Sequence, residues 1–138
     1  MDSGEARALF ASASVARLAT VDSAGGPHLV PITFAVDGEE IVTAVDHKPK
    51  RTTRLRRLDN IEANPQVSVL ADHYEDDWAS LWWVRADGRA RIVEPGGAGN
   101  ERAVSALAAR YPQYEERRPA DSVIVISVSR WSGWRADR

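Results

Sequence analysis

The sequence contains no cysteine, a single methionine and only two lysines in 138 residues. The absence of cysteine excludes disulfide bonds, thiolate metal ligands and cysteine nucleophiles, and it fits a reducing compartment. No apolar run approaches the length of a membrane-spanning helix, and residues 1–5 are acidic rather than the basic start of a signal peptide. We therefore expect a cytoplasmic protein with no membrane partner.

The common catalytic motifs are also missing. The three histidines, His28, His47 and His73, do not have the spacing of a metal site, so no metal ion is expected. The chain has no G-x-S-x-G nucleophile motif, no Walker loop and no G-x-G-x-x-G dinucleotide fingerprint. No catalytic residue can be named, so an enzyme with this sequence would take its chemistry from a cofactor.

The overall composition is that of an ordinary globular domain. Apolar residues make up 43% of the chain and charged residues 28%, values typical of soluble folds. This length is sufficient for one domain, residues 1–138, with a buried core. The formal net charge of −2 argues against a protein whose whole surface binds nucleic acid.

Short alternating segments separated by turn residues predict a mainly β protein with short helices. Strands are expected at residues 15–21, 28–36, 40–45, 66–71, 81–86, 89–93 and 123–128. Asp37-Gly38 and Asp87-Gly88 are strong hairpin signals. Helices are expected after a Ser3 cap, from Thr52 to residue 61, and after an Asn100 cap. Antiparallel strands at this spacing favour a small closed barrel, because closure removes exposed sheet edges.

The most unusual segment is a basic loop at residues 48–57, which holds six basic residues, both lysines among them, and no acid. This loop would connect the end of a strand to a helix that opens on two threonines, and a proline stiffens it. Its cations, the threonine hydroxyls and the free N–H groups of the helix would then all point into one small volume. The candidate phosphate ligands are Lys48, Lys50, Arg51 and Thr52. A solvated charged surface is the alternative interpretation.

Three of the five tryptophans, Trp78, Trp82 and Trp83, lie within six positions. Adjacent residues of a strand face opposite sides, so Trp82 and Trp83 cannot both enter one core. One of them can face a cleft or a partner subunit, and Arg85 shares the face of Trp83. An aromatic wall for a planar ring is one interpretation, and a large core with a hydrophobic interface is the other.

The order of four motifs resembles the pyridoxamine 5'-phosphate oxidase-like family of FMN-binding split-barrel proteins. The motifs are R-L-A-T-V at 17–21, G-P-H-L-V-P-I at 26–32, K-R-T-x-x-L-x-x-L at 50–58 with N-P at 64–65, and W-W-V-R-A-D-G-R-A at 82–90. The similarity covers about residues 15–128. Within the family it is strongest to the actinobacterial branch that uses the deazaflavin coenzyme F-420.

This resemblance implies a six- to seven-stranded antiparallel split β-barrel and a homodimer with two cofactors in clefts at the interface. The family's phosphate-binding positions correspond to Lys48, Lys50, Arg51 and Thr52. Its ring-contacting backbone corresponds to Pro31, Ile32 and Thr33. An aromatic strand with Trp78 and Trp83 would complete the pocket, from the same subunit or from its partner.

Three function hypotheses follow. The first is an F-420-dependent oxidoreductase that transfers a hydride to a small conjugated C=C or C=N substrate, with Tyr74, His28 or solvent as the proton donor. The second keeps the fold and uses FMN instead. The third is a non-enzymatic nucleic-acid-binding β-barrel, which the net charge opposes. Vitamin B6 oxidation is not expected, because residues 130–138 lack the histidine of the Arg and His pair found in true pyridoxamine-phosphate oxidases.

Overall fold

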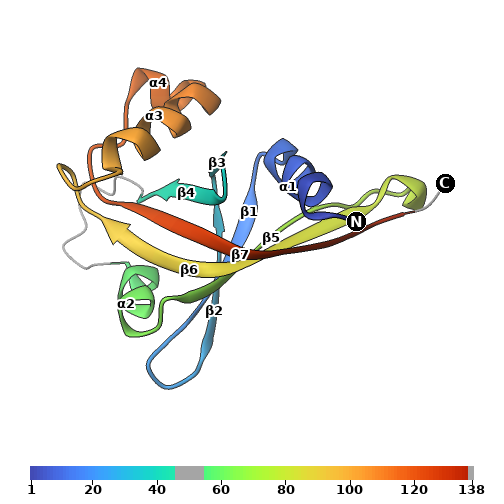
Figure 1. Cartoon of the computed structure of the whole chain (residues 1–138), viewed down its shortest axis with the longest axis horizontal. Coiled ribbons are helices and arrows are strands. Elements are labelled where there is room, and N and C mark those ends of the chain that lie inside the picture. The colour runs from blue at the N-terminus through green and yellow to red at the C-terminus, as the bar shows by residue number, and fades with distance from the viewer. Residues whose placement is uncertain (46–54, 137–138) are drawn as a thin grey trace.

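The computed structural model describes residues 1–45 and 55–136. In this part of the chain, antiparallel strands form one seven-stranded sheet with the order β2-β1-β5-β6-β7-β4-β3 (Figure 1). The strands are β1 (Ala16–Val21), β2 (Pro27–Ile32), β3 (Ala35–Asp37), β4 (Glu40–Ala44), β5 (Gln66–His73), β6 (Trp82–Val93) and β7 (Val123–Arg135). The helices are α1 (Ser3–Ser12), α2 (Arg56–Ala63), α3 (Asn100–Arg110) and α4 (Pro112–Glu116), with a 3₁₀ turn η1 (Trp78–Ser80).

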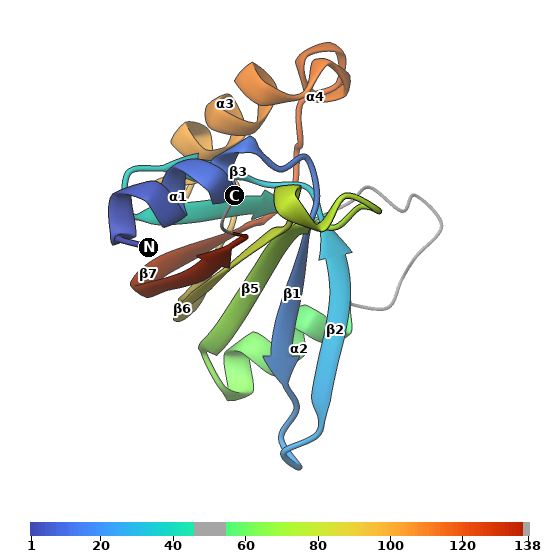
Figure 2. The ribbon, with the colours of Figure 1, turned by 90° about the vertical axis from the view of Figure 1, so that its right-hand side faces the viewer.

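The sheet is split between two strands that are neighbours in the chain. Strands β2 and β3 lie at opposite ends of the strand order, yet only Thr33 and Phe34 separate them in the sequence. Strand β2 pairs with β1, and β3 pairs with β4 (Figure 2). Because β2 is an edge strand, it tolerates Pro27 and Pro31, which lack the N–H that a central strand needs. The expected split β-barrel is confirmed, although the strand expected at 28–36 is divided in two.

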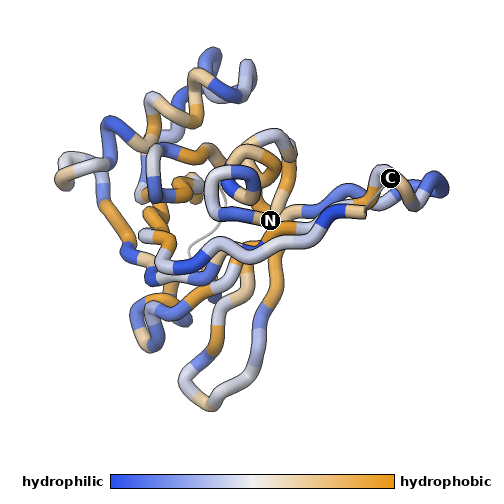
Figure 3. The backbone as a smooth tube through the Cα atoms, turned by 45° about the vertical axis from the view of Figure 1, so that its right-hand side comes forward, coloured by the Kyte–Doolittle hydropathy of each residue, from blue (hydrophilic) through white to orange (hydrophobic). Residues whose placement is uncertain are grey.

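Two apolar cores explain the run of apolar residues at the start of β7. Ile124 and Ile126 face the first core, which α1 covers with Phe10. Val123 and Val125 face the second core, between the sheet and α3. A strand buried on both faces needs apolar side chains at every position. The hydropathy-coloured backbone shows these orange segments gathered inside the molecule (Figure 3).

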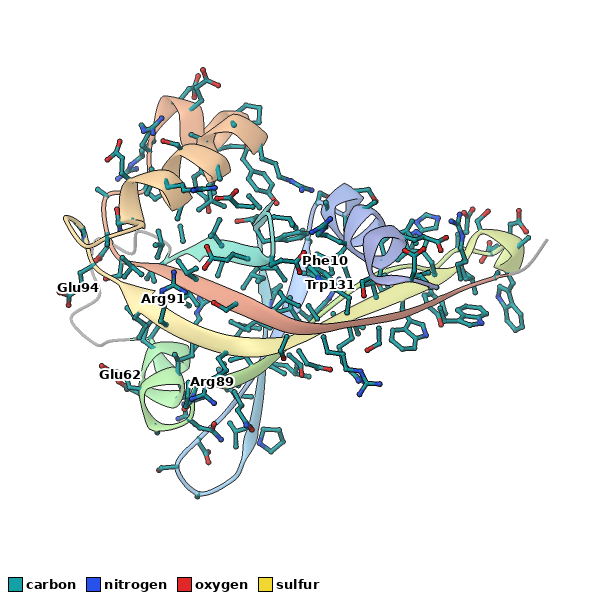
Figure 4. The ribbon with its side chains drawn as sticks, viewed as in Figure 1. Phe10, Glu62, Arg89, Arg91, Glu94 and Trp131 are labelled. Atoms are coloured by element: carbon teal, nitrogen blue, oxygen red, sulfur yellow. The ribbon has the colours of Figure 1, made fainter. Side chains whose placement is uncertain are left out.

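Helix α1 closes the first core through an aromatic cluster. The ring of Phe10 lies 4.8 Å from that of Phe34 and 5.4 Å from that of Trp131, in tilted and edge-on arrangements that suit aromatic pairs. Phe10 and Trp131 lie together beneath α1 in Figure 4. The helix begins at an N-cap formed by Asp2, which accepts a hydrogen bond from the Glu5 N–H at 2.8 Å. The cap expected at Ser3 is therefore wrong by one residue.

The hairpin expected at Asp87-Gly88 is wrong, because β6 continues through both residues. The register of β6 against β7 shifts between them, as a β-bulge requires. A Cβ atom on Gly88 would lie 2.2 Å from the Ser127 carbonyl oxygen. Glycine is needed here for the close approach of two backbones rather than for a turn. Two strands expected at 81–86 and 89–93 are thus one long strand.

The helix starts also differ from expectation. Helix α2 begins at Arg56 after an extended Leu55, so it does not open at Thr52. The N-cap of α3 is Gly99, with a left-handed φ of 94°. Asn100 does not cap the helix, because its buried side-chain amide donates to the Val93 carbonyl at 3.0 Å and ties α3 to the end of β6.

An arm extends beyond the barrel. It consists of the end of β5, η1, the start of β6 and the end of β7, and it projects to one side of the molecule (Figure 1). Strand β7 continues to Arg135, well past the end expected at 128.

Within the described ranges, no helix has the length and apolar character to cross a membrane.

Candidate functional site

A cleft of about 200 Å³ lies at the split in the barrel. Its lining, which we call the split cleft, consists of Val15, Pro31, Ile32, Thr33, Thr43, Ala44, Arg57 and Tyr114. All three residues proposed to run along a cofactor ring, Pro31, Ile32 and Thr33, are part of it. Pro31 is exposed, whereas the side chain of Ile32 is buried in the first core.

The described residues on either side of residues 46–54 meet at the split cleft. Ala44 ends β4, just before residues 46–54, and Arg57 lies in the first turn of α2, just after them. Lys48, Lys50, Arg51 and Thr52 themselves lie outside the described residues, so their phosphate-binding role stays a prediction.

Hydrogen bonds to β4 and α4 hold Thr33 in the wall of the cleft. The hydroxyl of Thr43 donates to the Thr33 carbonyl at 2.7 Å. The hydroxyl of Tyr114, at the far end of the sequence, lies 3.0 Å from the Thr33 hydroxyl. Backbone and side chain of Thr33 are thus both fixed, which favours a preformed site.

Tyr111 fixes the next residue of the same connection. Its hydroxyl accepts a hydrogen bond from the Phe34 N–H at 3.0 Å. The same oxygen lies 2.9 Å from the Phe34 carbonyl and 3.0 Å from the Ser14 carbonyl, to which it can donate. One phenol therefore contacts backbone groups of two segments where β2 and β3 separate.

Arg110 joins α3 to α1 behind this connection. Its guanidinium donates to the carbonyls of Ala11 and Ala13, just where α1 ends. The same group lies 4.9 Å from the centre of the Phe34 ring and 5.4 Å from that of Tyr111, at cation–π range. Sequence reasoning missed Arg110, Tyr111 and Tyr114. The available signal was a pair of tyrosines flanking Pro112, since buried tyrosine hydroxyls need partners.

The tryptophans of the arm do not line the split cleft of this chain. Trp78 is 76% exposed on η1. Trp82 packs against the first core, whereas Trp83 lies on the opposite face, opposite Trp134 of β7 and on the same face as Arg85. The proposed aromatic wall of Trp78 and Trp83 remains a prediction for a partner subunit.

A second cleft of about 550 Å³ adjoins the split cleft. We call it the Arg17 cleft, and its lining is Ser12, Ala13, Ser14, Val15, Arg17, Asp72, His73, Tyr74 and Trp82. A third depression, of about 700 Å³, lies over the β6–β7 bulge and contains none of the predicted site residues.

Charge pairing supports the fold around the site. Arg102 of α3 donates two hydrogen bonds to Asp37 of β3, at 2.6 and 3.1 Å. These bonds lower the pKa of the Asp37 carboxyl below its ordinary value, and they raise the pKa of Arg102.

In the described part of the chain, no group of three or more His, Cys, Asp or Glu residues is placed to hold a metal ion.

The sheet order and the cleft at its split define a split-barrel protein, and solved structures share this architecture. The conserved hypothetical protein Rv2991 of Mycobacterium tuberculosis is 24% identical with a TM-score of 0.77, over 98% of this chain and 85% of that one. An FAD-binding protein of Mesorhizobium loti is 20% identical with a TM-score of 0.74, over 96% and 94% of the two chains. The heme storage protein HutZ of Vibrio cholerae is 18% identical with a TM-score of 0.73, over 96% and 93%.

The family assignment comes from the sequence. The family model described as pyridoxamine 5'-phosphate oxidase matches residues 3–135. The chain therefore belongs to the pyridoxamine 5'-phosphate oxidase family, as the order of its motifs indicated. No curated protein sequence matches it.

Proposed function

We propose that the protein is an oxidoreductase that holds a phosphorylated flavin-type cofactor in the split cleft. The observation that carries this proposal is the convergence of two features on one small volume. Pro31, Ile32 and Thr33 present the surface for a planar ring, and Ala44 and Arg57, on either side of residues 46–54, line the same cleft. A ring cofactor with a phosphate tail needs these two surfaces side by side.

Coenzyme F-420 is the cofactor that we propose first, with FMN as the alternative. Both carry a tricyclic ring and a phosphate on a flexible tail, so the cleft suits both. The motifs at 17–21, 26–32, 50–58 and 82–90 support F-420, because they are most similar to the deazaflavin-using branch. A segment with six cations and no acid at residues 48–57 also suits a strongly anionic tail.

The residues of the split cleft would bind and orient rather than react. The bound cofactor would supply a hydride to a small conjugated C=C or C=N substrate. Ile32 and Pro31 would support the ring, while Tyr114 and Thr43 keep Thr33 from moving. Fixed walls of this kind reduce the entropy lost when reactants are aligned. We do not propose vitamin B6 as the substrate, since the C-terminal histidine it needs is absent.

A second copy of the chain would complete the site. The cleft volume of about 200 Å³ is below the roughly 300–1,000 Å³ of complete small-molecule sites. The outer face beside it exposes apolar side chains, with Leu29 68%, Leu70 37% and Trp134 45% exposed. We propose a homodimer that covers this face and brings Trp78 or Trp83 of one subunit to the cofactor of the other. Light scattering at micromolar concentration checks the proposal, and a monomer would contradict it.

Some solved structures similar to this chain are of heme storage or heme binding proteins, but the split cleft does not favour heme. The described lining contains no histidine, cysteine or methionine to serve as an axial ligand.

Nucleic acid binding is disfavoured by the net charge of −2. It would show a steep loss of affinity with salt.

Titration of the cofactor-free protein with oxidised F-420 and, in parallel, with FMN tests the proposed function. Tryptophan fluorescence is the readout. We expect saturable binding that weakens by about 2–4 kcal/mol in the double variant Lys50→Ala with Arg51→Ala, because charge-assisted contacts to phosphate are lost.

The double variant Arg117→Ala with Arg130→Ala is the matched control. It also removes two positive charges, from exposed positions that line neither the split cleft nor the Arg17 cleft. Unchanged binding in the control and weakened binding in the test variant support the phosphate site. A preference for FMN moves the protein to the flavin alternative, and binding of neither cofactor contradicts the proposed function.

A further inference from the structure

We propose that the Arg17 cleft binds a small planar carboxylic acid beside the cofactor, and that this acid is the class of molecule the enzyme reduces. The substrate role rests on the proposed function. The acid-binding site itself rests on the geometry of the Arg17 cleft and can be tested without a cofactor.

The two clefts share a wall. Val15 lines both of them. Arg17 lies directly opposite Pro31 in the pairing of β1 with β2. Directly opposed residues of an antiparallel pair point to the same face of the sheet, with their Cβ atoms about 5 Å apart. A ligand on Arg17 would therefore lie next to the strand that we propose to support the cofactor ring.

Arg17 is available to bind an anion. Its side chain is exposed, and within residues 1–45 and 55–136 it has neither an ion-pair nor a hydrogen-bond partner. Its two cross-strand neighbours, Pro31 and Leu70, are uncharged. The planar guanidinium fork matches the two oxygens of a carboxylate.

Arg85 differs from Arg17 in that its guanidinium already has a partner. It occupies the same row across the sheet, opposite Leu70 on the other side. Its guanidinium, however, already binds both oxygens of Asp87, at 3.1 and 3.2 Å. Arg85 does not line the Arg17 cleft, whereas Arg17 does. Of these two guanidinium groups in one row, only that of Arg17 is free for a ligand within the described structure.

The remaining lining selects a planar ligand with a polar end. Trp82 and Tyr74 provide aromatic surface in the cleft, and Trp82 is supported from behind by the first core. Asp72 is exposed, lies two residues from Leu70 on the sheet face of Arg17, and can accept a hydrogen bond from a hydroxyl or N–H of the ligand. A volume of about 550 Å³ lies within the roughly 300–1,000 Å³ of small-molecule sites.

Binding of 4-hydroxybenzoate to the full-length, cofactor-free protein tests the site. It carries a carboxylate for Arg17, a ring for Trp82 and a hydroxyl for Asp72. We expect saturable quenching of tryptophan fluorescence that Trp82→Phe largely removes. Arg17→Gln should weaken binding at least tenfold, and Arg17→Lys less, because it keeps the charge without the fork. Arg85→Gln should change affinity by less than twofold.

Phenol, which lacks the carboxylate, is the control ligand, and we expect it to bind at least tenfold more weakly than 4-hydroxybenzoate. The proposal is overturned if quenching does not saturate, if phenol binds equally well, or if Arg17→Gln and Arg85→Gln weaken binding alike.

A second titration separates this proposal from the proposed function. Here 4-hydroxybenzoate is added to protein loaded with F-420 or FMN, and the absorbance of the bound ring is followed. A spectral shift that is lost in Arg17→Gln places the acid next to the cofactor. If neither cofactor binds but Arg17-dependent binding of the acid persists, the proposed function fails and the acid site stands. If the cofactor binds and the acid does not, the acid site fails and the proposed function stands.

Discussion

The hydroxyl oxygen of Tyr114 lies 3.0 Å from the hydroxyl of Thr33, across 81 positions of the sequence. This contact makes α4 part of the wall of the split cleft, and Tyr111 holds the adjacent Phe34 in the same way. The strand connection at the split is therefore fixed from outside the sheet, by two phenols on one short segment.

The two tyrosines should differ in their contribution to stability. We expect Tyr114→Phe to lower the free energy of unfolding by about 0.5–1.5 kcal/mol, since one side-chain hydrogen bond is lost. Tyr111→Phe should cost about 1–3 kcal/mol, because the Phe34 N–H loses its partner in a half-buried place. Urea denaturation of both variants measures the difference. An equal or smaller cost for Tyr111→Phe would contradict the role given to its hydroxyl.

Gly88 should not tolerate a side chain. A Cβ there would lie 2.2 Å from the Ser127 carbonyl oxygen, so Gly88→Ala must push β6 and β7 apart. We expect a loss of at least about 2 kcal/mol, as for other overpacked sites. The control is Gly4→Ala in α1, where the nearest atom to a new Cβ is 3.4 Å away. That variant should be neutral or stabilised by up to about 1 kcal/mol, and thermal or urea unfolding compares the two.

Arg110 should matter through its bonds to backbone carbonyls as well as through its charge. Arg110→Met keeps much of the apolar stem but leaves the carbonyls of Ala11 and Ala13 without these donors. We expect a loss of about 2–4 kcal/mol. Arg118→Met is the control, because Arg118 is exposed and its hydrogen bond goes to the Ser105 hydroxyl, at 3.0 Å. Its effect should stay within about 0.5 kcal/mol.

The Asp37–Arg102 pair should make stability depend on pH in the acid range. The pKa of Asp37 in the folded state lies below its ordinary value of 3.8, because Arg102 binds the charged carboxylate. The unfolded chain therefore takes up this proton first as the pH falls. The stabilisation is complete above about pH 5 and disappears as the pH is lowered through the folded pKa.

The variant Asp37→Asn tests this dependence. Its deficit in unfolding free energy relative to the parent protein should be constant from about pH 7 to pH 5 and shrink toward zero below about pH 4. Glu94→Gln, at an exposed residue after β6, is the control and should show no such convergence. A deficit that grows as the pH falls would contradict the assigned direction of the pKa shift.

The sequence predicted the architecture where local pattern and tertiary pairing agree. The turn at Asp37-Gly38 joins β3 to β4, with Gly38 at a positive φ of 61°. The apolar run at 123–126 lies in the strand expected at 123–128 and is buried on both faces. The structure places Pro31 and Ile32 of the motif at 26–32 in the split cleft, and their contact with a cofactor ring stays a prediction.

Other features of the candidate site could not be read from the chain. Arg110 and Tyr111 act on residues 77 to 99 positions away, and nothing local marks such partners. Val15 carries no motif for a cleft, yet the fold brings it together with Thr33. Their roles depend on which elements pack together.

By itself, the sequence determined the class of fold and the family, because strand alternation and motif order are local properties. Only the tertiary structure decided whether each of the two Asp-Gly pairs forms a turn. Both dipeptides have the same turn propensity. Asp37-Gly38 can turn because β3 ends there, whereas Asp87-Gly88 stays extended because the backbone of β7 approaches so closely that the missing side chain serves packing.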